Sequence, residues 1–162
     1  MGNGFAYPRF PIYLEKYNPA SQKKAYDLFA SQANANSPFN ASIFMFEGYS
    51  TQGVKAVEAK STAFAFREDN LLNAPLISYS PISDKTLVKK AADLGNQLRQ
   101  ILLDGSGRKE LHAYINYAYG NESPAQWYGS EAWRQEKLRK LKSQYDPDGR
   151  FNFYGPIPRE QR

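Results

Sequence analysis

The sequence predicts an α+β fold, in which an antiparallel sheet carries helices packed on one face. Helical patterns and short runs of aromatic and β-branched residues follow one another as helix, three strands, helix, strand, helix. A chain of 162 residues is long enough for one domain with its own core. Hydrophobic residues make up 41% and aromatic residues 15% of it, which is a globular composition.

The N-terminal segment 1–17 is expected to be irregular, because Pro8 and Pro11 interrupt regular structure. It has no apolar stretch after a basic start and so does not resemble a signal peptide; the sequence assigns no cellular compartment. The first helix is expected at about 20–33, with Asn18 as its N-cap.

Strands are expected wherever aromatic and β-branched residues cluster between turn residues. These stretches are 41–50, 54–59 continuing into 62–67, 74–80 and 111–118.

The long helix between the last two strands has the clearest pattern, since its apolar residues recur at steps of four and three. They are Leu87, Ala91, Leu94, Leu98 and Ile101. Ser83 is expected to cap this helix, and Gly105 and Gly107 to end it. A last helix is expected from Ser130 to about residue 144, followed by a turn at Asp146–Gly149.

The composition also excludes several kinds of site. The chain has no cysteine and a single histidine, His112, so thiolate and multi-histidine metal sites are not expected. No apolar run has membrane-spanning length. The net charge is +5, but its lysines and arginines concentrate at 134–142, where a solvated helix face is the simpler interpretation. Nucleic-acid and membrane partners are therefore not expected.

The last third carries four motifs in a fixed order. They are YINY from Tyr114, WYG from Trp127, LRKLKSQYDP from Leu138 and FNFYGPIP from Phe151. Together they resemble the C-terminal berberine-bridge-enzyme-like segment of FAD-linked oxidoreductases of the vanillyl-alcohol oxidase type.

An upstream patch supports this resemblance. FEGYSTQG from Phe46 and TAFAFR ending at Arg67 are similar to a substrate-domain stretch that usually reads Gly-Gly and then Phe-Pro-His-Arg. Here Gln52 replaces the first glycine, and the tetrad 64–67 has lost its proline and histidine. A base glutamate found in some members has no clear counterpart; Glu58 is a candidate, although a surface role is the simpler one.

The resemblance implies a partial substrate domain of a flavin oxidoreductase. Residues 18–110 would form the substrate-domain part and 111–158 the berberine-bridge-enzyme-like segment. This corresponds to only the C-terminal third of a typical member, and the flavin-binding domain with its pyrophosphate loops is missing from the sequence.

The resemblance also implies roles for particular residues. Tyr114 and Asn116 would contact FAD, and Tyr117 would be the catalytic residue facing the substrate. In a strand, Tyr114 and Asn116 would share one face and Tyr117 would lie on the other. The implied substrate-binding residues are Phe46, Arg67, Ser78 and Tyr79.

Two functional hypotheses stay open. In the first, the chain is the substrate-domain portion of an FAD-linked oxidoreductase that oxidises a small organic alcohol, amine or secondary metabolite. A flavin-binding domain would then be supplied in trans or by self-association. In the second, the chain is a stand-alone, flavin-free domain that binds, cyclises or isomerises a hydrophobic small molecule.

Overall fold

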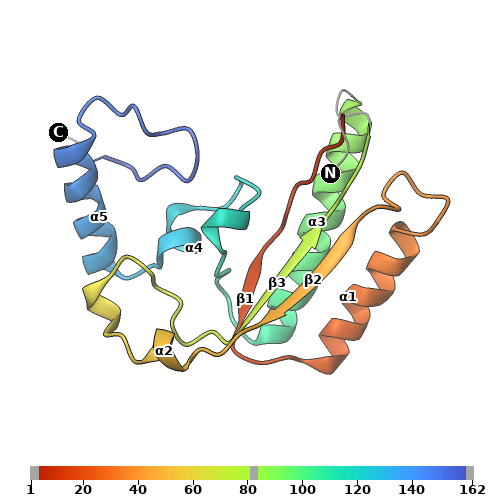
Figure 1. Ribbon diagram of the computed structural model, residues 1–162, viewed down its shortest axis with the longest axis horizontal. Coiled ribbons are helices and arrows are strands. Elements are labelled where there is room, and N and C mark those ends of the chain that lie inside the picture. Colours follow the sequence, from red (N-terminus) through yellow and green to blue (C-terminus); the bar gives the residue numbers. More distant parts are fainter. Residues whose placement is uncertain (1–3, 81–83, 160–162) are drawn as a thin grey trace.

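The computed structural model describes residues 4–80 and 84–159 (Figure 1). Three antiparallel strands form one sheet in the order β1-β3-β2, with β3 in the centre. The strands are β1 (Ile12–Leu14), β2 (Ile43–Gly48) and β3 (Leu71–Leu76).

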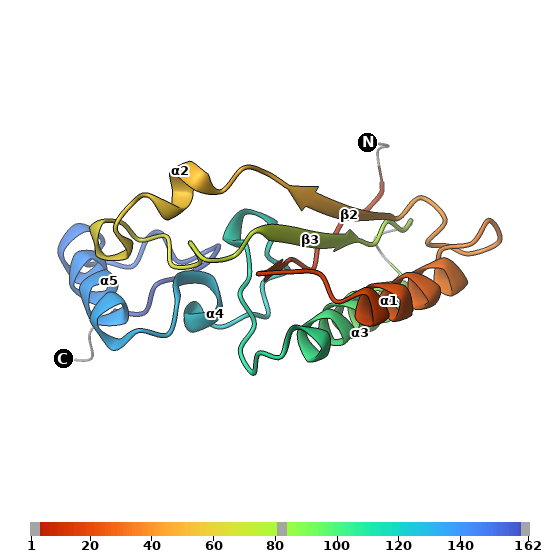
Figure 2. The same cartoon turned by 90° about the horizontal axis from the view of Figure 1, so that it is seen from below.

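Two long helices, α1 (Pro19–Gln32) and α3 (Lys85–Ser106), lie side by side on one face of this sheet (Figure 2). The short helices α2 (Gln52–Lys55) and α4 (Pro124–Tyr128), the helix α5 (Ala132–Tyr145) and the 3₁₀ turns η1 (Ala59–Ser61) and η2 (Ile115–Tyr117) complete the described chain. This arrangement confirms the predicted α+β class, with helices on one face of an antiparallel sheet.

The core lies between the sheet and α3. All five residues of the predicted apolar stripe belong to the core or pack against it, and Leu98 is completely buried. Burying one such leucine stabilises the fold by about 1.5–3 kcal/mol. Opposite them, Phe10 and Ile12 are also buried. Gly95 lets α3 approach closely, since a Cβ atom there would lie 2.1 Å from Cδ2 of Phe10.

The helix ends are fixed by local chemistry. Asn18 caps α1 as predicted, with its Oδ1 accepting a hydrogen bond from the Ser21 amide (3.2 Å). The predicted cap Ser83 lies outside the described residues. Asp84 is the N-cap of α3, and its Oδ1 accepts from the Thr86 amide at 2.8 Å. Gly107 ends α3 in the left-handed conformation (φ 75°).

The predicted strands at 54–59 and 62–67 are wrong. The first stretch contains part of α2 and the start of η1, and the second has no regular structure. The chain here folds back on itself, because the Arg67 guanidinium donates to the Val54 carbonyl (2.9 Å) and to the Thr62 hydroxyl. Neither stretch has a neighbouring strand with which to pair.

The predicted strand at 111–118 is also wrong, because its middle forms the 3₁₀ turn η2. Besides α2, η1 and η2, two further elements were not predicted. β1 lies within the segment expected to be irregular; it is an edge strand of three residues that begins after Pro11, a position that proline tolerates. α4 begins with a capping box between Ser123 and Gln126, a local signal that the sequence does contain.

Candidate functional site

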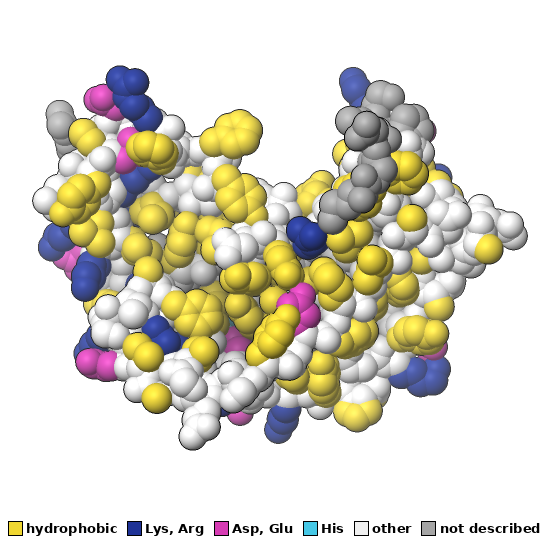
Figure 3. Space-filling model, viewed as in Figure 1, with side chains coloured by type: hydrophobic (Ala, Val, Ile, Leu, Met, Phe, Trp, Pro, Cys, Tyr) yellow, Lys and Arg dark blue, Asp and Glu magenta, His cyan; other side chains and the backbone are white. Residues whose placement is uncertain are grey.

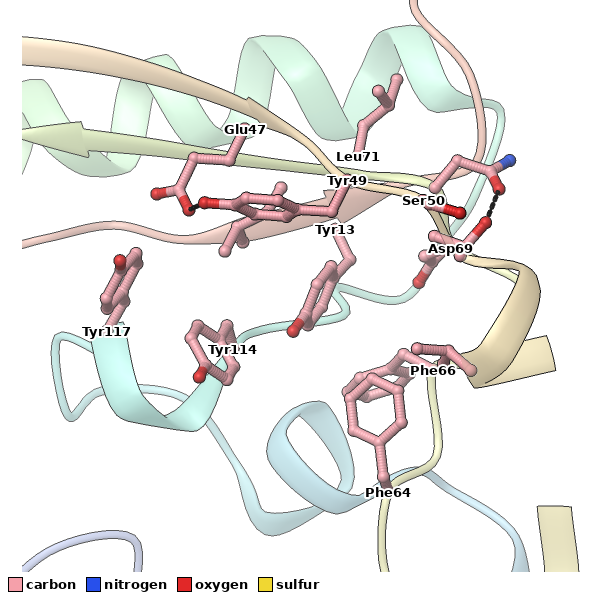
Figure 4. A pocket seen from close by; sticks show the side chains of 14 residues that line it. Tyr13, Glu47, Tyr49, Ser50, Phe64, Phe66, Asp69, Leu71, Tyr114 and Tyr117 are labelled. Atoms are coloured by element: carbon pink, nitrogen blue, oxygen red, sulfur yellow. Dashed lines mark hydrogen bonds between the residues drawn. The ribbon is translucent and has the colours of Figure 1, made fainter. Parts of the chain in front are cut away.

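A pocket of about 390 Å³ opens between the sheet, η2 and the loop that follows β2 (Figure 4). Tyr13 on β1, Leu72 on β3 and Glu47 on β2 are paired across the sheet, so their side chains share one face. Phe44 points to the other face, where it packs against Phe29 of α1 (5.6 Å between ring centroids). The pocket therefore occupies the sheet face that the long helices leave free.

Aromatic rings form most of the wall. Tyr13 is central, with its ring centroid 5.8 Å from Tyr114, 6.1 Å from Phe64 and 6.0 Å from Phe66. Tyr114 and Tyr117 lie 5.1 Å apart, edge to face. Hydrophobic side chains gather around a hollow in the middle of this face (Figure 3). The pocket can hold a small, flat, mostly apolar molecule.

Of the predicted site residues, Tyr114 and Tyr117 line the pocket. Residues three apart in a 3₁₀ turn point the same way, so these two tyrosines share a side, contrary to the expected strand alternation. Asn116 is exposed beside them, and its Nδ2 donates to the Tyr114 hydroxyl at 2.7 Å.

The other four predicted residues lie elsewhere. Arg67 is buried behind the wall and holds the 54–62 loop through the bonds described above. Ser78 and Tyr79 are buried beyond the end of β3, where Tyr79 packs against Phe39. Phe46 is on the opposite face of β2, stacked on Phe44 at 4.6 Å. The structure thus brings only part of the predicted set together, and the roles given to these residues stay predictions.

Sequence reasoning missed Tyr13, Glu47 and Tyr49. The Tyr49 hydroxyl donates to Oε2 of Glu47 at 2.6 Å, and both side chains line the pocket. Strand alternation shows that Glu47 and Phe46 point to opposite faces, but not which of the two faces meets the pocket. Glu58, the candidate base, is exposed at the start of η1 and does not line the pocket.

The surroundings of the tyrosines keep their phenols protonated. Burial, followed by the Glu47 charge, raises the pKa of Tyr117, while the nearby Arg9 opposes this shift. The Arg9 guanidinium lies 4.8 Å above the Tyr117 ring. The hydrogen bond to Glu47 raises the pKa of Tyr49, and burial raises that of Tyr13. These tyrosines are therefore hydrogen-bond donors at neutral pH.

A second polar cluster adjoins the pocket. Asp69 is buried, its Oδ2 lies 2.8 Å from Nδ1 of His112, and its Oδ1 accepts from Arg108. The His112 ring stacks on Phe66 with centroids 4.2 Å apart. This cluster fixes Phe66 against the pocket. Among residues 4–80 and 84–159, no group of three or more potential ligands could hold a metal ion, and no helix is long and apolar enough to cross a bilayer.

Comparison with known proteins gives matches along nearly the whole chain. A family model described as "Berberine and berberine like" matches residues 113–158. The FAD-linked oxidoreductase chyH of Penicillium rubens is 63% identical over 150 residues, which cover 93% of this chain and 30% of that protein. The FAD-linked oxidoreductase chry5 of Gibberella zeae is 54% identical over 155 residues, which cover 96% of this chain and 30% of that protein.

Solved structures share the fold. Wild-type BBE-like 1 from Physcomitrella patens has a TM-score of 0.75 at 18% identity, covering 97% of this chain and 31% of that one. Berberine bridge enzyme from Eschscholzia californica has a TM-score of 0.74 at 13% identity, and the match covers 98% of this chain and 34% of that one. The matches confirm the resemblance drawn from the motifs. The chain spans about 30% of the length of the curated relatives it matches.

Proposed function

We propose that this chain, which carries a berberine-bridge-enzyme-like segment and is similar to part of the FAD-linked oxidoreductases, forms the substrate side of such an enzyme's active site. The whole enzyme would oxidise a small organic alcohol, amine or secondary metabolite. One observation carries the proposal: the pocket is walled by aromatic rings, and two of them, Tyr114 and Tyr117, come from the segment that the family model matches.

The residues present fit one part of FAD and not another. Asn116 is exposed, and its carboxamide has more hydrogen-bonding capacity than its single bond to Tyr114 uses. Such a group suits the polar edge of the flavin ring. The glycines at 105 and 107, however, lie at the C-terminal end of α3, where the helix dipole is unfavourable for a pyrophosphate. Residues of a flavin-binding domain would therefore hold the phosphates, whether that domain is on the same polypeptide, supplied in trans or contributed by self-association.

Bound FAD would supply the hydride acceptor for the oxidation. The chain's own residues would bind and orient the substrate. The rings of Tyr13, Tyr114 and Phe64 would hold a flat molecule and keep water away from it. Tyr117 would donate a hydrogen bond to an oxygen or nitrogen of the substrate, since its raised pKa keeps the phenol protonated.

A second candidate function is favoured by one specific observation. Aromatic rings from β1, from residues 64–66 and from η2 surround a pocket of about 390 Å³, a volume that could hold a small apolar ligand without a flavin-binding domain. A stand-alone domain of this kind would bind a hydrophobic small molecule, and could promote its cyclisation or isomerisation by holding one conformer.

Reconstitution tests the first function against the second. The chain would be titrated with FAD, alone and together with the remaining portion of the Penicillium rubens relative expressed separately. Flavin absorbance and tryptophan fluorescence would report binding. We expect a yellow complex only when both pieces are present.

Asn116→Ala should weaken FAD retention in that complex, whereas the exposed Asn40→Ala should leave it unchanged. If a soluble, cooperatively folded chain forms no flavin complex in either mixture, the first function is contradicted. Binding of aromatic small molecules in that case would support the second.

A further inference from the structure

The pocket contains two carboxylates with different surroundings. Both oxygens of Asp69 are occupied, one by Arg108 and one by His112, so its charge is balanced within the fold. Glu47 takes part in no ion pair within the described ranges of the chain, and the Tyr49 hydroxyl donates one hydrogen bond to its Oε2. Of the two carboxylates, Glu47 is therefore the one that is available to a ligand.

An ionised carboxylate offers about four acceptor positions; the Tyr49 hydroxyl uses one, and the Tyr117 hydroxyl also interacts with this carboxylate, which leaves room for a ligand donor. Glu47 is half-exposed, so water reaches its remaining acceptor positions; a ligand that covers the carboxylate displaces this water and is favoured if it brings a donor of its own. Figure 4 shows the Glu47 carboxylate at one end of the pocket, near the hydroxyls of Tyr49 and Tyr117. The rings of Tyr13 and Tyr114 lie in contact with each other beside it, so a ring-shaped ligand packed against them would bring its edge to the carboxylate.

We propose that Glu47 determines which substrates bind, by accepting a hydrogen bond from an N–H or O–H group carried on the ring of a small aromatic molecule. This inference rests on the proposed function only in taking the pocket as the substrate site. The aromatic wall supplies shape and apolar contact, and Glu47 supplies the selection for a donor. A hydrogen bond to a charged acceptor is about twice as strong as one to a neutral acceptor, which makes the selection measurable.

Three related probes test the donor requirement on the unliganded chain. Indole has a ring N–H, 3-methylindole keeps it, and 1-methylindole replaces it with a methyl group. Affinities would be measured by saturation-transfer NMR and isothermal titration. We expect indole and 3-methylindole to bind about tenfold more tightly than 1-methylindole, a difference equivalent to about 1.4 kcal/mol. Equal affinities of the three probes, or no binding by any of them, would overturn the inference without need of a variant.

Two matched variants assign the preference to Glu47. Glu47→Gln keeps the size of the side chain and removes its charge, so the preference for indole over 1-methylindole should fall to about twofold. Glu58→Gln makes the same change at an exposed position outside the pocket and should keep the tenfold preference. A tenfold preference that persists in folded Glu47→Gln would place the acceptor elsewhere and reject the inference.

These measurements use no flavin, so the two proposals can fail separately. A donor preference that depends on Glu47, found in a chain that forms no flavin complex, would keep the inference and reject the oxidoreductase role. A flavin complex without the preference would do the opposite.

Discussion

Arg134 is the side chain whose removal should most clearly show what holds α5 to the rest of the fold. It is 1% exposed although it is charged, and it joins α5 to the loop that carries Phe64. Its Nη1 donates to the Thr62 carbonyl at 2.9 Å. Its Nη2 lies 3.1 Å from Oε1 of Glu131, and its guanidinium carbon is 4.4 Å from the centre of the Trp133 ring. Arg134→Met keeps the apolar stem and removes all of these contacts.

The expected loss of stability follows from the surroundings of each partner. The hydrogen bond from the guanidinium to the Thr62 carbonyl contributes about 1.5–3 kcal/mol, as is usual for a charged donor. The Glu131 side chain is 43% exposed, so water can replace the guanidinium there and that pair adds at most about 1 kcal/mol. The stacking on Trp133 adds about 0.5–1 kcal/mol. We expect the free energy of unfolding to fall by about 3 kcal/mol.

Urea denaturation followed by far-ultraviolet circular dichroism would measure this loss. With a slope of about 2 kcal/mol per molar urea, the midpoint should fall by about 1.5 M. Lys137→Met, an exposed change on the same helix, should move the midpoint by less than about 0.3 M. If Arg134→Met moves it no further than Lys137→Met does, Arg134 does not anchor α5 to this loop and the reasoning is refuted.

Two further changes test the helix packing and the C-terminal turn. Gly95→Ala should destabilise the fold by about 1–3 kcal/mol, because the new Cβ would overlap the Phe10 ring. Gly53→Ala is the control, since a Cβ atom there would meet nothing within 4 Å. Thermal melting should give Gly95→Ala the lower melting temperature, and a lower value for Gly53→Ala would contradict this packing. The Lys142 ammonium and two backbone amides hold the pKa of Asp146 at about 2, below its ordinary 3.8. The charged carboxylate therefore stabilises the fold above about pH 4, and this contribution is lost as the pH falls towards 2. Asp146→Asn should flatten the decline in stability over that range, and an unchanged acid transition would contradict the assignment.

The elements predicted correctly are those whose signals are local. The stripe on α3 and the cap of α1 depend on residues a few positions apart, and both are found as predicted. The strands at 54–59 and 62–67 failed because aromatic and β-branched residues indicate a strand only where a partner strand is present. Here the partner of residues 62–64 is the guanidinium of Arg134, some seventy positions away, which no local pattern reveals.

The candidate site was predictable to a lesser extent. The motif around Tyr114 and Tyr117 identified two residues of the wall, but the expected strand geometry was wrong because the chain forms a 3₁₀ turn there. On β2, the sequence could not show which face of the strand meets the pocket, and Phe46 was chosen where Glu47 faces it. That choice depends on where α1 packs, because Phe44 and Phe46 belong to the side that the helix covers.

The surroundings of Tyr117 bear on the role that the resemblance implies for it. The resemblance implies that Tyr117 faces the substrate, and to take a substrate proton it would need a pKa well below the ordinary value of about 10. Burial and the Glu47 charge move the pKa of Tyr117 upward instead, and the guanidinium above its ring only partly opposes them. With its phenol protonated, Tyr117 is suited to donate, while Glu47 can only accept if it is charged. A substrate that contacts both residues would replace their interaction with each other, and would therefore need both an acceptor and a donor. This requirement is more selective than the aromatic wall alone would impose, because the wall makes no distinction between polar groups of similar shape.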